Sequence, residues 1–217
     1  MNLLARIYNW SVPLEREALR HAVELVDVQP NERILDIATG TGALLQELAS
    51  RRVHYGHVIG IDRSRVMLLG VRDRPRAWQV VVADARELPV ADASFDVVFM
   101  SYLLHLLHHE DRSRVLEAAS RVLRPGGRIV TVTVGSRAAV PRWLLSALPA
   151  WTGLHPLDPR SELQNAGLHV AQAEYTSTGW PSLVVLATTM SEQPHSPPPY
   201  GQEAASGSSR SCGASNK

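Results

Sequence analysis

Five short apolar runs constrain the fold of this chain more than any other feature of its sequence. They cover residues 33–37, 58–62, 79–83, 95–100 and 128–134. Because apolar residues follow one another within each run, both faces of a strand formed there would be buried. Helical spacing of apolar residues predicts helices between the runs, over 13–26, 43–52, 65–71 and 111–123. The alternation predicts a doubly wound α/β fold, in which helices cover both sides of a mostly parallel sheet.

The alternation stops after Gly135. A short helix is expected at 161–166, and two strands at 168–177 and 182–189 form a C-terminal antiparallel β-hairpin. With the five earlier strands, the hairpin completes a seven-stranded sheet. We therefore expect one domain over residues 1–190, with N-terminal cap helices over 1–30. Residues 191–217 are rich in Pro, Ser and Gly, and a disordered tail is expected there.

Composition narrows the class of protein. A length of 217 residues suits a single domain with a proper core, and a net charge of +1 gives no support to bulk attraction to nucleic acid. The only cysteine, Cys212, provides neither a disulfide framework nor a cysteine metal cluster. With neither a secretion signal nor an apolar run of roughly 18 to 20 residues, a cytoplasmic protein is expected. Residues 2–10 are mildly amphipathic, which fits either peripheral membrane or lipid contact or packing over the domain itself.

A glycine turn follows the first apolar run. Gly40 and Gly42 let the backbone turn tightly and approach a ligand closely, and the predicted helix from Ala43 lies behind them. A Rossmann dinucleotide site would have a third small residue where Leu45 stands. Asp36, just before the turn, would repel a pyrophosphate but attract a cation. The turn therefore resembles a nucleotide loop that is not suited to NAD.

Three aspartates, Asp36, Asp62 and Asp84, each end one of three successive predicted strands. Ligands of open α/β sheets bind beyond the carboxyl ends of the strands, so these carboxylates should meet at one crevice. Asp62 follows Gly40 by 22 residues, a position from which an acidic residue conventionally binds ribose hydroxyls. Taken singly, each aspartate is equally consistent with a helix cap or a turn. The ordered set predicts a site for a cationic nucleoside.

These motifs resemble those of the class I S-adenosylmethionine-dependent methyltransferases, and more narrowly the branch that includes ubiquinone and menaquinone biosynthesis enzymes. The resemblance rests on motifs that occur in the family's order, at residues 35–42, 61–64, 83–89, 94–98 and 123–127, and it extends over about residues 30 to 190. It implies a Rossmann-like methyltransferase fold with S-adenosyl-L-methionine as cofactor.

The resemblance also implies roles for individual residues. Gly40 and Gly42 would face the methionine part of the cofactor, and Asp36 would help to orient its amino group. Asp62 would hold the ribose, while Asp84 and the backbone N–H of Ala85 would bind adenine. The remaining cofactor contacts would come from Tyr8, Ala38, Thr39, Arg63, Met67 and Ser101. Arg63 departs from the family, in which an apolar residue is more usual at this position.

Two residues after the fourth strand, Tyr102 and His105, are the candidate catalytic groups, because relatives place groups facing the methyl and the acceptor there. His105 is the best candidate base, since imidazole titrates near neutral pH. It equally fits a packing residue, because a sulfonium leaving group makes a base dispensable. His108, His109 and Glu110 do not predict a metal site, because adjacent histidines on a helix splay apart.

The expected function is methyl transfer to a small lipophilic or aromatic acceptor, such as a quinone or phenol. Residues 140–151 are rich in apolar and aromatic side chains, which fits either an acceptor pocket or a lid that packs on the sheet. Two alternatives stay open, a non-catalytic cofactor-binding or regulatory domain and a protein or RNA methyltransferase. The neutral charge disfavours a nucleic-acid partner, and the sequence leaves the oligomeric state undetermined.

Overall fold

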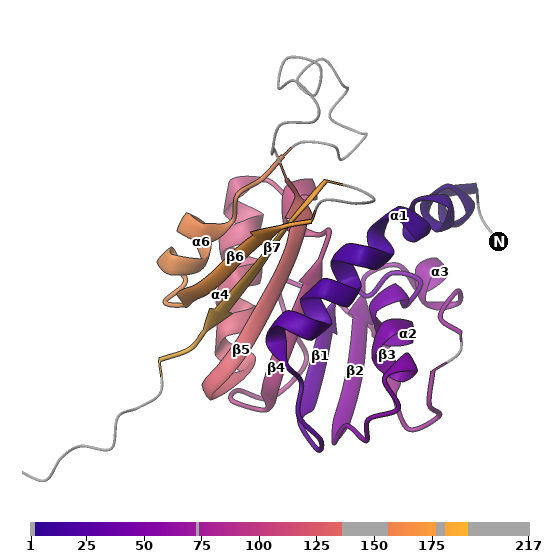
Figure 1. The fold of residues 1–217 in the computed structure, drawn as a ribbon, viewed down its shortest axis with the longest axis horizontal. Helices are drawn as coiled ribbons and strands as arrows, with labels where there is room; N and C mark the ends of the chain where they lie inside the picture. The colour runs from indigo at the N-terminus through magenta and orange to yellow at the C-terminus, as the bar shows by residue number, and fades with distance from the viewer. Residues whose placement is uncertain (1–2, 73, 136–155, 177–180, 191–217) are drawn as a thin grey trace, which may run out of the picture.

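The computed structural model describes residues 3–72, 74–135, 156–176 and 181–190, and only the backbone of 3–14 (Figure 1). Its helices are α1 (Leu3–Val26), α2 (Ala43–Ser50), α3 (Arg65–Leu68), the 3-10 turn η1 (Leu104–Leu106), α4 (His109–Val122) and α6 (Arg160–Asn165). Its strands are β1 (Arg33–Ile37), β2 (His57–Asp62), β3 (Gln79–Val82), β4 (Phe95–Ser101), β5 (Leu123–Val134), β6 (His169–Tyr175) and β7 (Ser182–Thr188). The predicted tail at 191–217 and the predicted acceptor-side stretch at 140–151 lie outside the described residues.

The seven strands form one sheet in the order β3-β2-β1-β4-β5-β7-β6. Strands β1 to β5 pair in parallel, whereas β7 pairs antiparallel with both β5 and β6. The chain reverses direction across the sheet between β3 and β4, so β1 and β4 lie side by side (Figure 1). In open α/β sheets such a switch point opens a crevice at the carboxyl ends of the strands.

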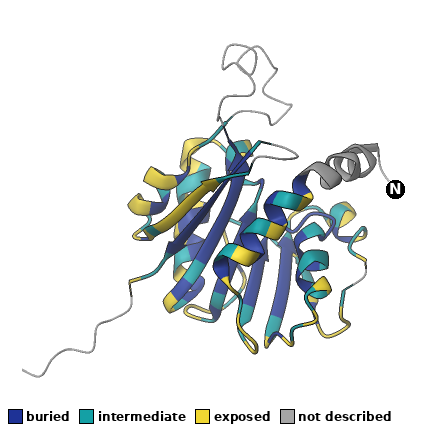
Figure 2. Ribbon diagram, in the orientation of Figure 1, coloured by how far each residue is buried: buried dark blue, intermediate teal, exposed yellow. Residues whose placement is uncertain are grey.

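Two apolar layers sandwich the sheet. Helices α1 and α2 pack on one face through residues such as Leu19 and Leu48, and α4 covers the other through Val115 and Leu116. The central strands are buried, whereas exposed residues lie on the outer sides of the helices and on the edge strand β6 (Figure 2). The predicted doubly wound α/β fold with a C-terminal antiparallel hairpin is therefore confirmed.

Two predicted boundaries were wrong by five residues or more. Helix α1 begins at Leu3 and not at Pro13, because the amphipathic run before the proline continues the helix. The helix therefore tolerates an interior proline, which loses one backbone hydrogen bond and crowds the carbonyl four residues before it. Strand β5 begins at Leu123 and not at the predicted residue 128, so it includes the turn-forming sequence Arg-Pro-Gly-Gly at 124–127. That turn lies within the strand as an irregularity, at which the pairing with β4 jumps from Leu123 to Arg128.

Candidate active site

A cavity of about 650 Å³ lies at the carboxyl ends of β1, β2, β3 and β4. Its volume falls in the range of small-molecule sites. Nine of the residues singled out in the sequence line it, and they come from all four strand ends and from α3: Ala38, Gly40, Asp62, Arg63, Met67, Asp84, Ala85, Ser101 and Tyr102. The fold therefore brings together residues that are up to 64 positions apart in the sequence.

The glycine turn is fixed by the strand beside it. The Asp62 carboxylate accepts hydrogen bonds from two backbone N–H groups, that of Gly40 at 2.9 Å and that of Ser64 at 2.7 Å. The backbone N–H of Thr39 donates to the carbonyl of Ile61 at 2.9 Å. Each carboxylate oxygen keeps a second lone pair, so Asp62 is held in place and still able to accept bonds from two hydroxyls.

Gly42 supports the turn and does not line the cavity. Its φ of 82° is left-handed, and a Cβ there would lie 2.9 Å from a methyl carbon of Val71. A larger residue would be strained and crowded at this position. Gly42 therefore lets α2 begin close behind the loop.

Asp36 is buried, with 1% of its surface exposed, and lines a small recess beside the main cavity. The Thr39 hydroxyl donates to its Oδ2 at 2.5 Å. Burial raises the pKa of Asp36 to about 7, the Thr39 bond opposes this rise, and the nearby Asp62 charge adds to it. A cation in the recess would favour the ionised form of Asp36.

Asp84 is held by the neighbouring arginine. Arg86 donates to its carboxylate through the backbone N–H at 2.9 Å, Nε at 3.0 Å and a terminal nitrogen at 2.7 Å. The other terminal nitrogen of Arg86 donates to Asp111 at 3.0 Å. The hydrogen bonds from Arg86 lower the pKa of Asp84 to about 2, so this carboxylate stays an acceptor at any physiological pH.

The end of β4 carries strained backbone and an unsatisfied hydroxyl. Ala38 and Tyr102, at neighbouring strand ends, have left-handed φ values of 61° and 55°. Such strain clusters at functional sites. The Ser101 Oγ is buried and has no hydrogen-bond partner among the described residues. Buried hydroxyls are normally satisfied, so Ser101 fits a site completed by a ligand.

The two candidate catalytic side chains lie against each other. The rings of Tyr102 and His105 meet edge to face, with centroids 6.1 Å apart. The Tyr102 hydroxyl is buried and shares a hydrogen bond of 2.7 Å with Ser182 on β7, and burial raises the pKa of this phenol above its usual range. Tyr102 lines the cavity, whereas His105, which lies in η1, is not one of the lining residues.

Not every residue named from the sequence reaches the main cavity. Asp36 and Thr39 line the recess instead, and the recess shares Ala38, Ser101 and Tyr102 with the cavity. Tyr8 lies in α1 among the residues whose side chains are outside the described part of the structure. The structure thus places most of the predicted residues in two adjoining spaces, whereas Gly42 and His105 line neither.

Sequence reasoning missed several lining residues. Glu15 of α1 is only 7% exposed and faces the recess together with Asp36. Its signal was present, because Glu15 is four residues before Leu19 and so shares the apolar face of the helix. Arg86 lies within the motif at 83–89 but was given no role. Leu106, Leu107 and Asp111 had no local signal, since only the tertiary fold brings η1 and α4 to the cavity.

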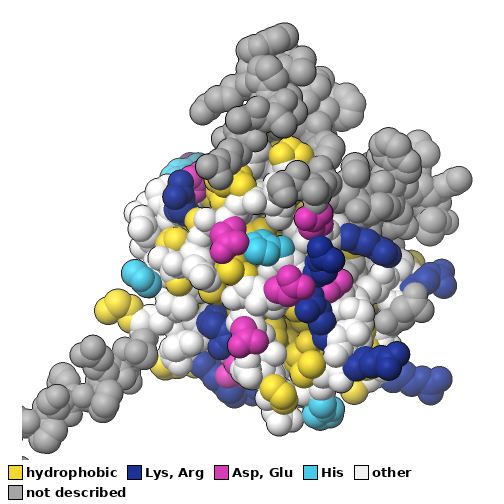
Figure 3. All heavy atoms as spheres, viewed as in Figure 1, with side chains coloured by type: hydrophobic (Ala, Val, Ile, Leu, Met, Phe, Trp, Pro, Cys, Tyr) yellow, Lys and Arg dark blue, Asp and Glu magenta, His cyan; other side chains and the backbone are white. Residues whose placement is uncertain are grey.

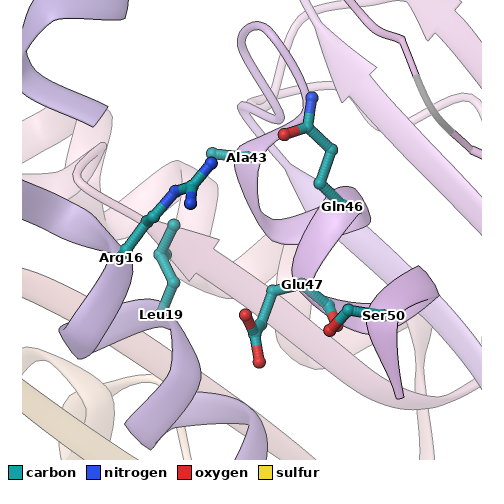
Figure 4. Close-up of a pocket in the computed structure, with 6 residues that line it drawn as sticks. All are labelled: Arg16, Leu19, Ala43, Gln46, Glu47 and Ser50. Carbon is teal, nitrogen blue, oxygen red and sulfur yellow. The ribbon is translucent and has the colours of Figure 1, made fainter. Parts of the chain in front are cut away.

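A second hollow, of about 160 Å³, lies between α1 and α2. Figure 4 shows Arg16 reaching from α1 toward Ala43, with Gln46, Glu47 and Ser50 along α2. Glu47 is already paired with Arg51 at 2.8 Å, and the hollow contains none of the three aspartates. Within the described ranges, no group of three or more His, Cys, Asp or Glu residues could hold a metal ion.

Comparison with known proteins agrees with this geometry. Residues 34–127 match the family model described as a methyltransferase domain. The chain is 32% identical to the demethylmenaquinone methyltransferase of Corynebacterium glutamicum over 77% of its own length and 69% of that protein. It is 40% identical to the ubiquinone/menaquinone biosynthesis C-methyltransferase UbiE of Ectopseudomonas mendocina over 55% of its own length and 48% of that protein. The chain therefore belongs to the class I S-adenosylmethionine-dependent methyltransferases, and within them to the UbiE-like type.

Proteins with low sequence identity to this chain have the same fold. A crystal structure of a methyltransferase from Methanosarcina mazei superposes with a TM-score of 0.63 at 22% identity, over 78% of this chain and 97% of that one. The chain spans about half the length of the first curated relatives that it matches. No helix in the described part of the chain is both long and apolar enough to cross a bilayer.

Proposed function

We propose that the chain transfers the methyl group of S-adenosylmethionine to a small lipophilic acceptor of the quinol or phenol type. The observation that carries this proposal is the cavity beyond the four strand ends, with Asp62 and Asp84 in its lining. Apolar lining is added by Leu103, Leu106 and Leu107. A polar nucleoside end and an apolar acceptor end suit the two reactants.

The residues present fit the cofactor. We propose that Asp62 accepts from the ribose hydroxyls, and that Asp84 accepts from the adenine amino group. The methionine end would lie in the cavity where it adjoins the recess of about 10 Å³, beside the Ser101 hydroxyl, which lacks a partner among the described residues. The carboxylates of Asp36 and Glu15 in the recess would favour positive charge there. Met67 and the stem of Arg63 would flank the base, beside the backbone N–H of Ala85.

Methyl transfer requires little from the protein beyond holding the two reactants in position. When bound, the cofactor supplies an electrophilic methyl on a good leaving group. The chain contributes approach geometry and exclusion of water. His105 contacts Tyr102 but does not itself line the cavity, so we propose that it accepts the acceptor's proton through one water. Tyr102 itself stays protonated, because burial raises the pKa of its phenol.

Relatives narrow the acceptor. Several similar proteins are named as ubiquinone/menaquinone biosynthesis C-methyltransferases or demethylmenaquinone methyltransferases. We propose an electron-rich ring carbon of a quinol as the methyl acceptor. The apolar lining from η1 supports this choice, because a lipophilic ring would be desolvated there.

Two measurements test the proposal. Calorimetry should show binding of S-adenosylmethionine and of its demethylated product but not of NAD. A labelled-methyl assay with reduced demethylmenaquinone analogues, simple phenols and amines should give a labelled quinol. Cofactor binding without transfer to any acceptor would favour the non-catalytic alternative, and binding of NAD alone would overturn the cofactor assignment. His105→Ala should lower the turnover number and leave cofactor affinity unchanged; an unchanged turnover number would remove the base role.

A further inference from the structure

Several exposed apolar side chains lie in segments that line the cavity. The described residues include five large hydrophobic side chains with more than a third of their surface exposed, and four belong to segments that line the cavity. Val66 (44%) lies between the lining residues Ser64 and Met67, and Val82 (54%) precedes Ala83. Leu69 (72%) is the C-cap of α3, and Leu106 (60%) lines the cavity itself.

Arginines are concentrated in and just after α3, near these apolar side chains in the sequence. Residues 63–76 contain five arginines and one aspartate, a formal charge of +4 in a chain whose total is +1. Arg65, Arg72 and Arg76 are exposed and form no ion pair with an acid in the described part of the chain. In Figure 3, a row of Lys and Arg side chains lies on the side of the molecule that carries α2 and α3. We call Arg65, Val66, Leu69, Arg72 and Arg76 the α3 rim.

The α3 rim combines positive charge with apolar surface, and this combination fits a membrane better than it fits nucleic acid. Exposed arginines attract any phosphate-rich surface, including nucleic acid. Nucleic acid would bind the arginines alone and would gain nothing from Leu69 and Val66. The interface of an anionic bilayer takes both, because guanidinium groups pair with lipid phosphates while apolar side chains enter the boundary with the acyl chains.

We propose that the α3 rim docks the protein on the surface of an anionic phospholipid bilayer. This docking goes beyond methyl transfer and does not depend on it. The nucleoside end of the cavity would then lie beside the membrane, because Arg63, Ser64 and Met67 join the rim to the cavity wall.

Sedimentation of the full chain with lipid vesicles tests the docking. The protein should bind vesicles of phosphatidylcholine mixed with phosphatidylglycerol and not vesicles of phosphatidylcholine alone, and added salt should weaken binding. Each arginine removed should lower vesicle affinity roughly fivefold, so the triple variant Arg65→Gln, Arg72→Gln, Arg76→Gln should lose about a hundredfold. Leu69→Ser should weaken binding with little change in its salt dependence.

Arg114→Gln is the matched control, because Arg114 is an exposed arginine on α4, on the other face of the sheet. It should bind vesicles like the wild type. Thermal unfolding and cofactor calorimetry check that each variant is folded, and these readouts separate loss of docking from loss of the cofactor site. Equal vesicle binding by the wild type and the triple variant would overturn the proposal. Tighter binding to duplex DNA or RNA than to anionic vesicles, lost in the triple variant, would assign the rim to nucleic acid instead.

Discussion

The Asp62 carboxylate accepts a hydrogen bond of 2.9 Å from the backbone N–H of Gly40, although the two residues are 22 positions apart. The bond joins the end of β2 to the glycine turn after β1. The same carboxylate also accepts from Ser64, the N-cap of α3. One side chain therefore aligns two loops of the cavity before any ligand enters, which lowers the conformational cost of binding.

Asp62→Ala should weaken binding of S-adenosylmethionine roughly 10- to 100-fold, because it removes the proposed ribose acceptor and releases the Gly40 N–H. Calorimetry measures the change. Asp92→Ala is the control, since Asp92 pairs with Arg121 on the surface before β4, at the end of the sheet opposite the cavity. An affinity equal to that of the wild type would remove the ribose role of Asp62.

Burial of Asp36 should make stability fall as pH rises. Its pKa is 3.8 when exposed and about 7 in the folded chain, so the folded state binds a proton that the unfolded state has lost. The stabilisation is complete below pH 3.8 and is lost progressively up to about pH 7, a difference on the order of 4 kcal/mol. Urea unfolding of Asp36→Asn should show a flatter pH profile than the wild type and higher stability at pH 8. Parallel profiles for the two proteins would contradict the raised pKa.

Glu15→Gln should reduce affinity for S-adenosylmethionine more than affinity for its demethylated product. Only the former carries a sulfonium charge, and Glu15 faces the recess beside Asp36. We expect about a tenfold loss for the charged ligand, roughly the effect of one weakened ionic contact. Glu17→Gln, on the same helix but outside the recess, should change neither affinity. Equal losses for both ligands would show that Glu15 acts only on the packing of α1.

Arg86→Ala should let the pKa of Asp84 rise from about 2 toward its ordinary range, because the variant removes the guanidinium that stabilises the carboxylate. NMR titration of the Asp84 carboxyl carbon measures this rise. Cofactor affinity at neutral pH should fall severalfold, since the adenine acceptor loses its fixed orientation. Arg86→Lys should restore the charge but not the two-pronged geometry, and so recover only part of the affinity. An Asp84 pKa unchanged in Arg86→Ala would refute the role of the guanidinium.

The sequence predicted the central sheet well, because β1 and β4 are apolar on both faces and admit no other assignment. Strand β1 has the predicted bounds, Arg33–Ile37. The errors came where a residue has two structural uses. Pro13 can open a helix or lie inside one, and Gly126 can end a helix or, with a φ of 77°, let a strand bulge.

For the candidate site, the strand-end residues were predictable and those from other elements were not. Asp62 and Asp84 follow apolar runs, so topology alone brings them to one edge. Arg86 and Asp111 meet only because α4 packs across the end of the sheet, a contact between residues 25 positions apart that no local pattern encodes. Glu15 was missed for a different reason. A single acid on the apolar face of a helix is read first as the edge of that face and not as a residue that contacts a ligand.

Strand β7 is buried between β5 and β6 over Ser182–Ala187 but is the last of the seven described strands to leave the ribosome. Until Ser182–Thr188 has been translated, β5 has an open edge. Such an edge invites pairing with another nascent chain. Truncation before Ser182 would therefore leave an aggregation-prone intermediate, and a chaperone that shields this edge during synthesis would act at the step where the fold is most vulnerable.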